Sequence, residues 1–165
     1  MKLAKSLDRL GTETAFSVLA EAKKLEAKGK PMIHLGLGQP DFKTPKHIVD
    51  AAKKALDDGH HGYVLSNGIL ECRQAVTRKI KKLYNQDIDP ERIIIMPGGK
   101  PTMSYAIQCF GEPGVEIVHP TPAFPIYESM INFTGAKPVP YDLTEDKDLK
   151  FNPEKILSLI TEKTK

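Results

Sequence analysis

A short apolar run that ends in paired glycines constrains this chain most. Residues Ile93–Met96 have the composition of a buried strand, and Pro97-Gly98-Gly99-Lys100 interrupts them before a helical pattern from Thr102 to Phe110. Glycine lets the backbone approach a ligand closely, and the first turn of a helix presents N–H groups together with a partial positive charge. The pattern therefore predicts a strand, a turn and a helix that together can bind an anion such as a phosphate group.

The remaining apolar residues alternate between strand-like and helix-like spacing. Two further strands are predicted at residues 116–119 and 137–141. Apolar residues three and four positions apart predict a first helix that begins near Thr12 or Thr14 and ends at Gly29. The same spacing predicts four further helices, at residues 45–59, 69–84, 125–133 and 152–160. This alternation is typical of an α/β fold in which helices connect parallel strands.

Composition excludes several classes of partner. The 165 residues carry a net charge of +3 from 24 basic and 21 acidic side chains, so we expect no nucleic-acid surface and no basic membrane patch. No apolar run approaches the roughly 18 residues that a membrane-spanning helix requires. The basic face of the helix at 69–84, which includes Arg73 and Arg78, is interpreted as solvated. We therefore expect a soluble, cytoplasmic protein that binds a small molecule.

Neither a metal site nor a nucleotide loop is predicted. Cys72 and Cys109 lie in helical patterns without a C-x-x-C spacing, so reduced, buried thiols are expected. His60 and His61 are adjacent and have no neighbouring ligand pattern, and His119 is interpreted as a hydrogen-bonded scaffold residue. The glycine turn is not a Walker A loop, because Ile94 and Pro101 replace the glycine and the Ser or Thr that this loop requires.

A second turn carries an aromatic side chain. In Pro120-Thr121-Pro122-Ala123-Phe124-Pro125-Ile126-Tyr127, three prolines restrict the backbone between a predicted strand and a predicted helix. Phe124 lies at the apex of this turn, where its ring can stack on a planar ligand. Packing of Phe124 into a core is the alternative that this segment leaves open.

Four motifs in order give a resemblance to a known family. They are Gly38-Gln39-Pro40-Asp41-Phe42, Tyr63 with Gly68-Ile69-Leu70 and Arg73, Gly98-Gly99-Lys100, and the proline-rich turn with Phe124. In this order and spacing, over residues 6–141, the chain resembles the class I/II aminotransferases, which are fold type I pyridoxal-phosphate enzymes. The resemblance implies a three-layer αβα large domain together with a segment of a small domain.

The resemblance also implies roles for individual residues. The backbone of Gly99 and Lys100 would bind the phosphate of pyridoxal 5′-phosphate, and Phe124 would stack on its pyridine ring, although Phe lacks the hydrogen-bond donor of the Trp or Tyr often found there. Gly38 would contact the amino-acid substrate. Tyr63 would reach the phosphate of the neighbouring subunit's cofactor, which implies a homodimer with shared active sites.

The Schiff-base lysine of this family has no match in the chain. The resemblance therefore implies an N-terminal fragment, inactive alone, with an N-terminal arm and small-domain segment at residues 1–45 and an incomplete cofactor-binding domain at residues 46–165. No catalytic residue and no metal ligand are assigned within it. The intact protein is expected to transfer an amino group between an amino acid and a 2-oxo acid. A pyridoxal-phosphate-dependent lyase on the same scaffold and a non-catalytic binding module are the alternatives.

Overall fold

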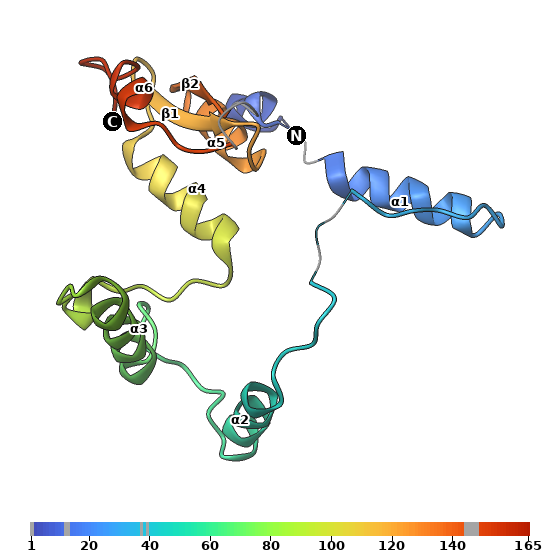
Figure 1. Ribbon diagram of the computed structural model, residues 1–165, viewed down its shortest axis with the longest axis vertical. Helices are drawn as coiled ribbons and strands as arrows, with labels where there is room; N and C mark the ends of the chain where they lie inside the picture. The colour runs from blue at the N-terminus through green and yellow to red at the C-terminus, as the bar shows by residue number, and fades with distance from the viewer. Residues whose placement is uncertain (1, 12–13, 37, 39, 144–148) are drawn as a thin grey trace. The chain divides into compact units, whose positions relative to one another are not determined.

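Helix α5 (Ile126–Thr134) connects two parallel strands, β1 (Glu116–Thr121) and β2 (Lys137–Asp142), as Figure 1 shows. Their register pairs Glu116 with Lys137 and Thr121 with Asp142. The helix ends at Gly135, whose φ of +88° is a left-handed conformation that glycine adopts without steric cost. This crossover confirms the α/β prediction for this part of the chain.

The computed structural model describes residues 2–11, 14–36, 38, 40–143 and 149–165. Their contacts form two compact units. We call Met1–Leu37 together with Gly98–Lys165 the sheet unit, and Gly38–Pro97 the helical unit. The predicted boundary at residue 45 concerns the domains that the family resemblance implies, and it stays a prediction.

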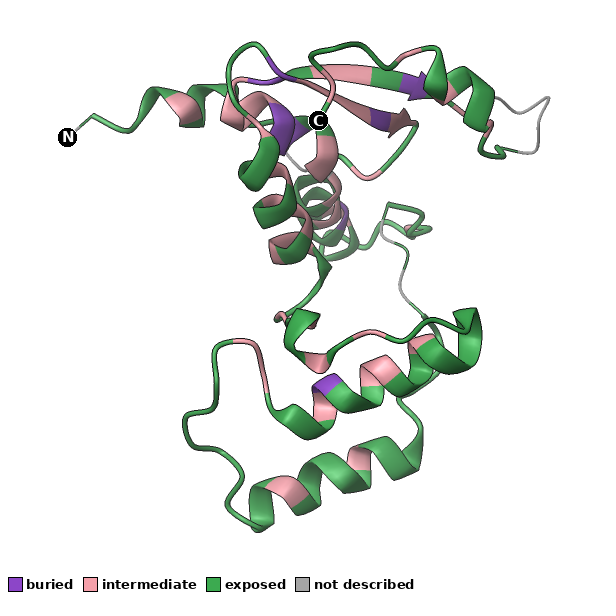
Figure 2. Ribbon diagram, turned by 90° about the vertical axis from the view of Figure 1, so that its left-hand side faces the viewer, coloured by how far each residue is buried: buried purple, intermediate pink, exposed green. Residues whose placement is uncertain are grey.

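The core of the sheet unit lies where α5 covers the strands. Ile131 of α5 is fully buried, and Val115 and Ala136, which flank the two strands, pack with it. Helix α4 (Gly99–Phe110) packs along α5 and contributes Ile107 to the same cluster. Figure 2 shows buried residues gathered in α5 and the strands. The core of the sheet unit is therefore formed by α5, α4 and the residues at the start of both strands.

Residues 163–165 pair with the edge of β1 that faces away from β2. The Glu116 N–H donates to the Lys163 carbonyl (2.9 Å), and the Lys165 N–H donates to the Glu116 carbonyl (3.1 Å). These residues follow α6 (Pro153–Leu157), which the Asn152 side chain caps by accepting from two backbone N–H groups. The helix is shorter than the predicted 152–160, because its last residues form three-residue turns instead of continuing the α-helical pattern.

The N-terminal part contains a 3-10 helix, η1 (Lys5–Arg9), and helix α1 (Thr14–Glu26). Helix α1 confirms the predicted amphipathic helix, and the chain turns at Gly29, where φ is +79°. Thr14 is the first helical residue rather than its cap, and Thr12, the other predicted cap, lies outside the described residues.

The helical unit contains α2 (Lys46–Asp57), α3 (Leu70–Tyr84) and the short 3-10 helix η2 (Pro90–Arg92). Helices α2 and α3 confirm the predictions at 45–59 and 69–84. The interpretation of Arg73 as a solvated cation is wrong, because only 1% of this residue is exposed. Its guanidinium is buried because three oxygen atoms of neighbouring turns surround it.

The predicted strand at Ile93–Met96 is not a strand in the structure. A strand requires a ladder of hydrogen bonds to a neighbouring strand, and in the described part of the chain these residues form no such ladder. The backbone is extended at Ile93, and the Ile95 N–H donates to the carbonyl of Asn67 (3.1 Å). The apolar pattern therefore reports an extended segment, but the described residues supply no ladder.

Both cysteines are free, and one expectation about them is wrong. Cys72 in α3 is half-buried, whereas Cys109 in α4 is exposed. Two positions along a helix turn a side chain by about 200°. Because α4 presents Ile107 to the core, Cys109 lies on the opposite side, toward solvent.

Truncating Ile131 tests the position of the core. Ile131→Ala is expected to lower the free energy of unfolding by about 2–5 kcal/mol, and Ile131→Val by about 0.5–1.5 kcal/mol, because each deletes methyl groups from a fully packed site. Urea unfolding of the complete protein measures the loss. Leu157→Ala is the control, since Leu157 is 66% exposed. Equal losses at positions 131 and 157 would contradict this core.

The pH dependence of stability tests the pairing at the start of β1. Hydrogen bonds from Lys137 and Thr161, with the charges of Lys137 and Lys163, hold the pKa of Glu116 below its ordinary value of 4.5. Because this pKa is lower in the folded state than in the unfolded state, the ionised Glu116 carboxylate stabilises the fold at pH values above the unfolded-state pKa. The contribution is lost as the pH falls through the folded-state pKa.

NMR titration of the Glu116 carboxyl group is the measurement. Lys137→Met is expected to raise its pKa most and Thr161→Val to raise it less, because these residues donate the two hydrogen bonds. The substitution Glu162→Gln, at an exposed neighbour, is expected to leave it unchanged. An unchanged Glu116 pKa in Lys137→Met would overturn the assignment.

Candidate functional site

Helix α4 begins at the predicted glycine turn. Its N-cap is Gly98, with φ +98° and ψ 171°, and no side chain caps the helix. The helix starts at Gly99, three residues before the predicted start at Thr102, so Gly99 and Lys100 lie in its first turn. The first turn is where an α-helix directs backbone N–H groups outward and carries its positive partial charge. This end of α4 therefore has the local chemistry of an anion site.

The space beside Gly98 is open. A Cβ atom built at Gly98 would meet nothing within 4 Å, and one at Gly99 would meet only the Met103 methyl group at 3.8 Å. Thr102 closes the turn from the other side, since its hydroxyl donates to the Gly98 carbonyl (3.3 Å). An anion can therefore approach the backbone here without displacing a side chain.

Phe124 lies in the turn between β1 and α5, as predicted. Its half-buried ring packs edge-on against Tyr127, with the ring centroids 6.5 Å apart and the planes at 87°. Pro125 follows as the N-cap of α5. The Phe124 ring thus contacts Tyr127, an aromatic residue in the first turn of α5.

Lys100 connects the two predicted features. Its ammonium nitrogen lies 5.4 Å from the centroid of the Phe124 ring and 5.2 Å from that of Phe16 in α1. Both distances are within the range of cation–π attraction. The structure thus brings the Lys100 side chain, in the first turn of α4, to Phe124, and the family resemblance assigns both residues to one cofactor.

Sequence reasoning missed Phe16 at this place. It is an apolar position of an amphipathic helix, which predicts a core side chain, yet 51% of Phe16 is exposed. Helical spacing alone gives no signal that distinguishes a core aromatic from one beside a site.

Tyr63 and Gly38 belong to the helical unit. Tyr63 is fully exposed in the segment between α2 and α3, beside a hollow that Gly59, His60 and Val64 also line. Gly38 is exposed, and a Cβ atom there would meet nothing within 4 Å. Their proposed contacts with cofactor and substrate stay predictions.

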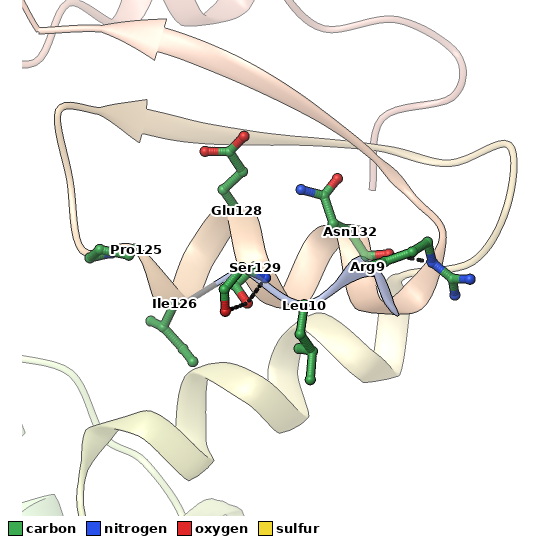
Figure 3. Close-up of a pocket in the computed structure, with 8 residues that line it drawn as sticks. Arg9, Leu10, Pro125, Ile126, Glu128, Ser129 and Asn132 are labelled. Carbon is green, nitrogen blue, oxygen red and sulfur yellow. Dashed lines mark hydrogen bonds between the residues drawn. The ribbon is translucent and has the colours of Figure 1, made fainter. Parts of the chain in front are cut away.

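A separate hollow of about 330 Å³ lies between the N-terminal segment and α5 (Figure 3). The Arg9 guanidinium donates to the carbonyls of Asn132 (2.8 Å) and Phe133 (2.7 Å), at the C-terminal end of α5. The Gly11 N–H donates to the Ser129 hydroxyl (2.9 Å). These bonds fasten the N-terminal segment to α5. Because neither Gly99, Lys100 nor Phe124 lines this hollow, we do not assign it to the anion site.

The structure places His119 as a hydrogen-bonded residue of the scaffold, as the sequence predicts. His119 is buried in β1, with Nδ1 3.1 Å from the Pro120 carbonyl oxygen, and His60 and His61 are exposed between α2 and α3. Within the ranges that the structure describes, no group of three or more His, Cys, Asp or Glu side chains could hold a metal ion. In the same ranges, no helix has the length and hydrophobicity to cross a membrane.

Comparisons with known proteins place these features in a family. The family described as aminotransferase class I and II matches residues 30–165. Aspartate aminotransferase of Bacillus subtilis is 37% identical over 165 residues, which are 100% of this chain and 42% of that protein. The (5-formylfuran-3-yl)methyl phosphate transaminase of Methanocaldococcus jannaschii is 41% identical over 142 residues, 86% of this chain and 38% of that protein.

A solved structure matches the fold as well. Aspartate aminotransferase from Thermus thermophilus with maleate gives a TM-score of 0.92 at 29% identity, over 100% of this chain and 43% of that one. The chain thus spans less than half the length of these relatives, and it has the fold of the N-terminal segment of fold type I aminotransferases. On sequence and structure together, this chain belongs to the class I and II aminotransferase family.

Proposed function

We propose that the complete protein is a pyridoxal-phosphate-dependent aminotransferase that transfers an amino group between an amino acid and a 2-oxo acid. The observation that carries the proposal is the convergence of the α4 N-terminus and the Phe124 ring, which the Lys100 side chain spans. An anion site next to an aromatic face suits a cofactor that has a phosphate group and a planar ring.

The residues present fit this cofactor. The first turn of α4, at Gly99 and Lys100, would hold the phosphate, because the Gly98 side of the turn is open and the helix end carries positive partial charge. Phe124 would hold the ring by stacking, with Tyr127 fixing its orientation. Lys100 adds positive charge beside both groups and so favours the phosphate dianion.

The substrate and the second subunit belong to the same proposal. Gly38 would leave room for the amino-acid substrate near its backbone, since it has no side chain and its surroundings are open. Tyr63 would extend to the phosphate of the neighbouring subunit's cofactor in a homodimer, which its complete exposure allows. The domain division at residue 45 and a cytoplasmic location are part of this proposal.

When bound, the cofactor supplies an aldehyde that exchanges with the substrate amino group and a ring that withdraws electrons from the α-carbon. The described residues bind and orient, and none of them is assigned a proton to move. We propose that the lysine that moves the proton lies in the part of the complete protein that corresponds to the remaining length of the relatives.

An amino-transfer assay tests the reaction class. Mixed with an amino acid alone, the complete protein with bound pyridoxal 5′-phosphate is expected to release one equivalent of 2-oxo acid per cofactor, because the amino group stays on the cofactor. Quantifying the oxo acid and the cofactor absorbance spectrum measures this. Release of ammonia would instead identify the lyase alternative, and a protein that binds no cofactor would overturn the proposal.

Substitution of Gly98 tests the phosphate site. Gly98→Ala is expected to weaken binding of pyridoxal 5′-phosphate at least about tenfold, because alanine is strained at this backbone conformation and its methyl group enters the space assigned to the phosphate. Absorbance titration of the complete apoprotein measures the dissociation constant.

Gly114→Ala is the matched control for this substitution. Gly114 has φ +94°, close to the +98° of Gly98, and its surroundings are equally open, but it lies between α4 and β1. Both substitutions are expected to lower stability by about 1–3 kcal/mol, since both force alanine into positive φ. If Gly114→Ala weakens cofactor binding as much as Gly98→Ala does, the effect is one of stability and the assignment fails.

A further inference from the structure

The Lys100 ammonium group lies over two aromatic rings that come from different parts of the sheet unit. Its nitrogen is 5.4 Å from the centroid of Phe124, in the turn before α5, and 5.2 Å from the centroid of Phe16 in α1. Lys100 itself is half-buried in the first turn of α4. One cation therefore connects α1, the start of α4 and the aromatic turn, which all belong to the sheet unit.

Core packing does not account for the Phe16 ring. Leu19 and Ala22 of α1 line a hollow together with residues 32–36, so they form the side of the helix that faces this neighbouring segment. Phe16 lies outside that hollow, and 51% of it is exposed. Within the described ranges, the ring interaction that Phe16 makes is the one with Lys100. The contact with the cation is therefore the feature that distinguishes this aromatic side chain from an ordinary exposed one.

The segment before α1 is attached to α5. The Gly11 N–H donates to the Ser129 hydroxyl (2.9 Å), and the same hydroxyl donates to the Gly11 carbonyl (3.3 Å). A hydroxyl can do both, because it has one donor and two acceptor lone pairs. Phe16 follows Gly11 by five residues, so this attachment limits how far its ring can move from the α4 and α5 pair. Phe16 therefore reaches Lys100 from an anchored point.

Two ring faces restrict a side chain that is otherwise flexible. A lysine side chain populates many rotamers in solvent, and ordering it costs entropy. The face of an aromatic ring carries negative potential and attracts an ammonium group, which an aliphatic side chain of similar size does not do. The second ring thus helps to keep the Lys100 charge at Phe124 before any ligand binds.

We propose that Phe16 is a positioning residue that holds the Lys100 ammonium group at the Phe124 ring. This inference rests on the proposed function, because Lys100 and Phe124 gain their roles in cofactor binding there. Phe16 acts through Lys100 and is assigned no contact with the cofactor. A charge that is already held at the site attracts the phosphate without the cost of ordering the lysine on binding. Helix α1 thereby contributes to a cofactor site that is otherwise formed by α4 and the turn before α5.

Phe16→Leu in the complete protein tests the proposal. Leucine keeps an apolar side chain but removes the ring. The dissociation constant of pyridoxal 5′-phosphate is expected to rise about two- to fivefold, which is the range of a cation–π contact at an exposed site. Absorbance titration of the complete apoprotein measures it. Phe16→Tyr keeps the ring and is expected to bind the cofactor as the wild type does.

A fluorinated series separates the charge distribution of the ring from its shape. Fluorine substituents withdraw electrons and weaken the negative potential of the ring face, while the ring keeps nearly the same size. Replacement of Phe16 by mono-, di- and trifluorophenylalanine is expected to raise the cofactor dissociation constant progressively, toward the value of Phe16→Leu. A ring that served only as a packing surface would give no such progression, and equal binding across the series overturns the inference.

NMR of the apoprotein reports the position of Lys100 without the cofactor. Protons over a ring face shift upfield, so the Lys100 Cε protons are expected upfield of those of solvated lysines and less so in Phe16→Leu. The signal is assigned by its loss in Lys100→Met. Lys155 is the internal control, because its ammonium lies 5.4 Å from the Tyr141 ring centroid and its shift is expected to stay unchanged. An unchanged Lys100 shift in Phe16→Leu overturns the inference.

Phe110→Leu is the matched control for loss of an aromatic ring. Phe110 is the last residue of α4, at the opposite end from Lys100, and is 63% exposed. Its substitution is expected to leave both the cofactor dissociation constant and the Lys100 shift unchanged. If Phe110→Leu weakens cofactor binding as much as Phe16→Leu does, the effect is general and the inference fails.

The outcomes distinguish this inference from the proposed function. Wild-type protein that binds no pyridoxal 5′-phosphate overturns the proposed function and with it the contribution of Phe16 to cofactor binding, while the Lys100 shift still reports whether Phe16 holds the ammonium group. Wild-type protein that binds the cofactor, together with a Phe16→Leu variant that binds it equally well, overturns the inference alone. Tighter binding in Phe16→Leu also overturns it, because the rings would then hold Lys100 away from the cofactor.

Discussion

The start of α4 is the constraint on which the site depends. The helix begins at Gly99 after the N-cap Gly98, and no side chain accepts a hydrogen bond from the N–H groups of its first turn. Another group must therefore accept from these N–H groups. Packing of α4 along α5 fixes the direction of that helix end, because α5 is anchored by the fully buried Ile131. The turn with Phe124 precedes α5 directly, and the Phe124 ring contacts Tyr127 in the first turn of that helix. The proposed anion site and the proposed aromatic platform thus both depend on one helix pair.

Elements with a strong local signal were predictable from the sequence. The crossover from β1 through α5 to β2, the helices α1, α2 and α3, and the glycine turn all follow from apolar spacing and from Gly and Pro positions. The segment at Ile93–Met96 was not, because an apolar run shows that a strand is possible, whereas a ladder depends on a partner elsewhere in the sequence. The resemblance assigns Lys100 and Phe124 to the same cofactor, whereas the approach of Phe16 to Lys100 was out of reach, since the sequence gives no distances between distant residues.

Two arginines illustrate the difference between a local sequence pattern and contacts that depend on the fold. From their neighbours in sequence, Arg9 and Arg73 are ordinary surface cations. In the structure Arg9 binds the last carbonyls of α5, where a cation also offsets the negative end of the helix, and Arg73 is buried among three oxygen atoms. Both donate to backbone carbonyls, which any residue type supplies; the acceptors of Arg9 are more than 120 residues away in the sequence, whereas Arg73 reaches the carbonyls of Gly68 and Pro90 and also the Glu91 carboxylate. No residue pattern therefore predicts which arginine will do so.

The prolines within the strands restrict how this sheet can grow. The N–H groups of Lys137 and Leu143 donate toward β1, so positions 138 and 140 of β2 face the opposite edge, and both are proline. That outer edge lacks two of its donors and is unsuited to accept another strand. Along β1, the edge that pairs with the C-terminal residues loses its donor only at Pro120. Enlargement of the sheet, whether by the same polypeptide or by another, is thereby directed to one side.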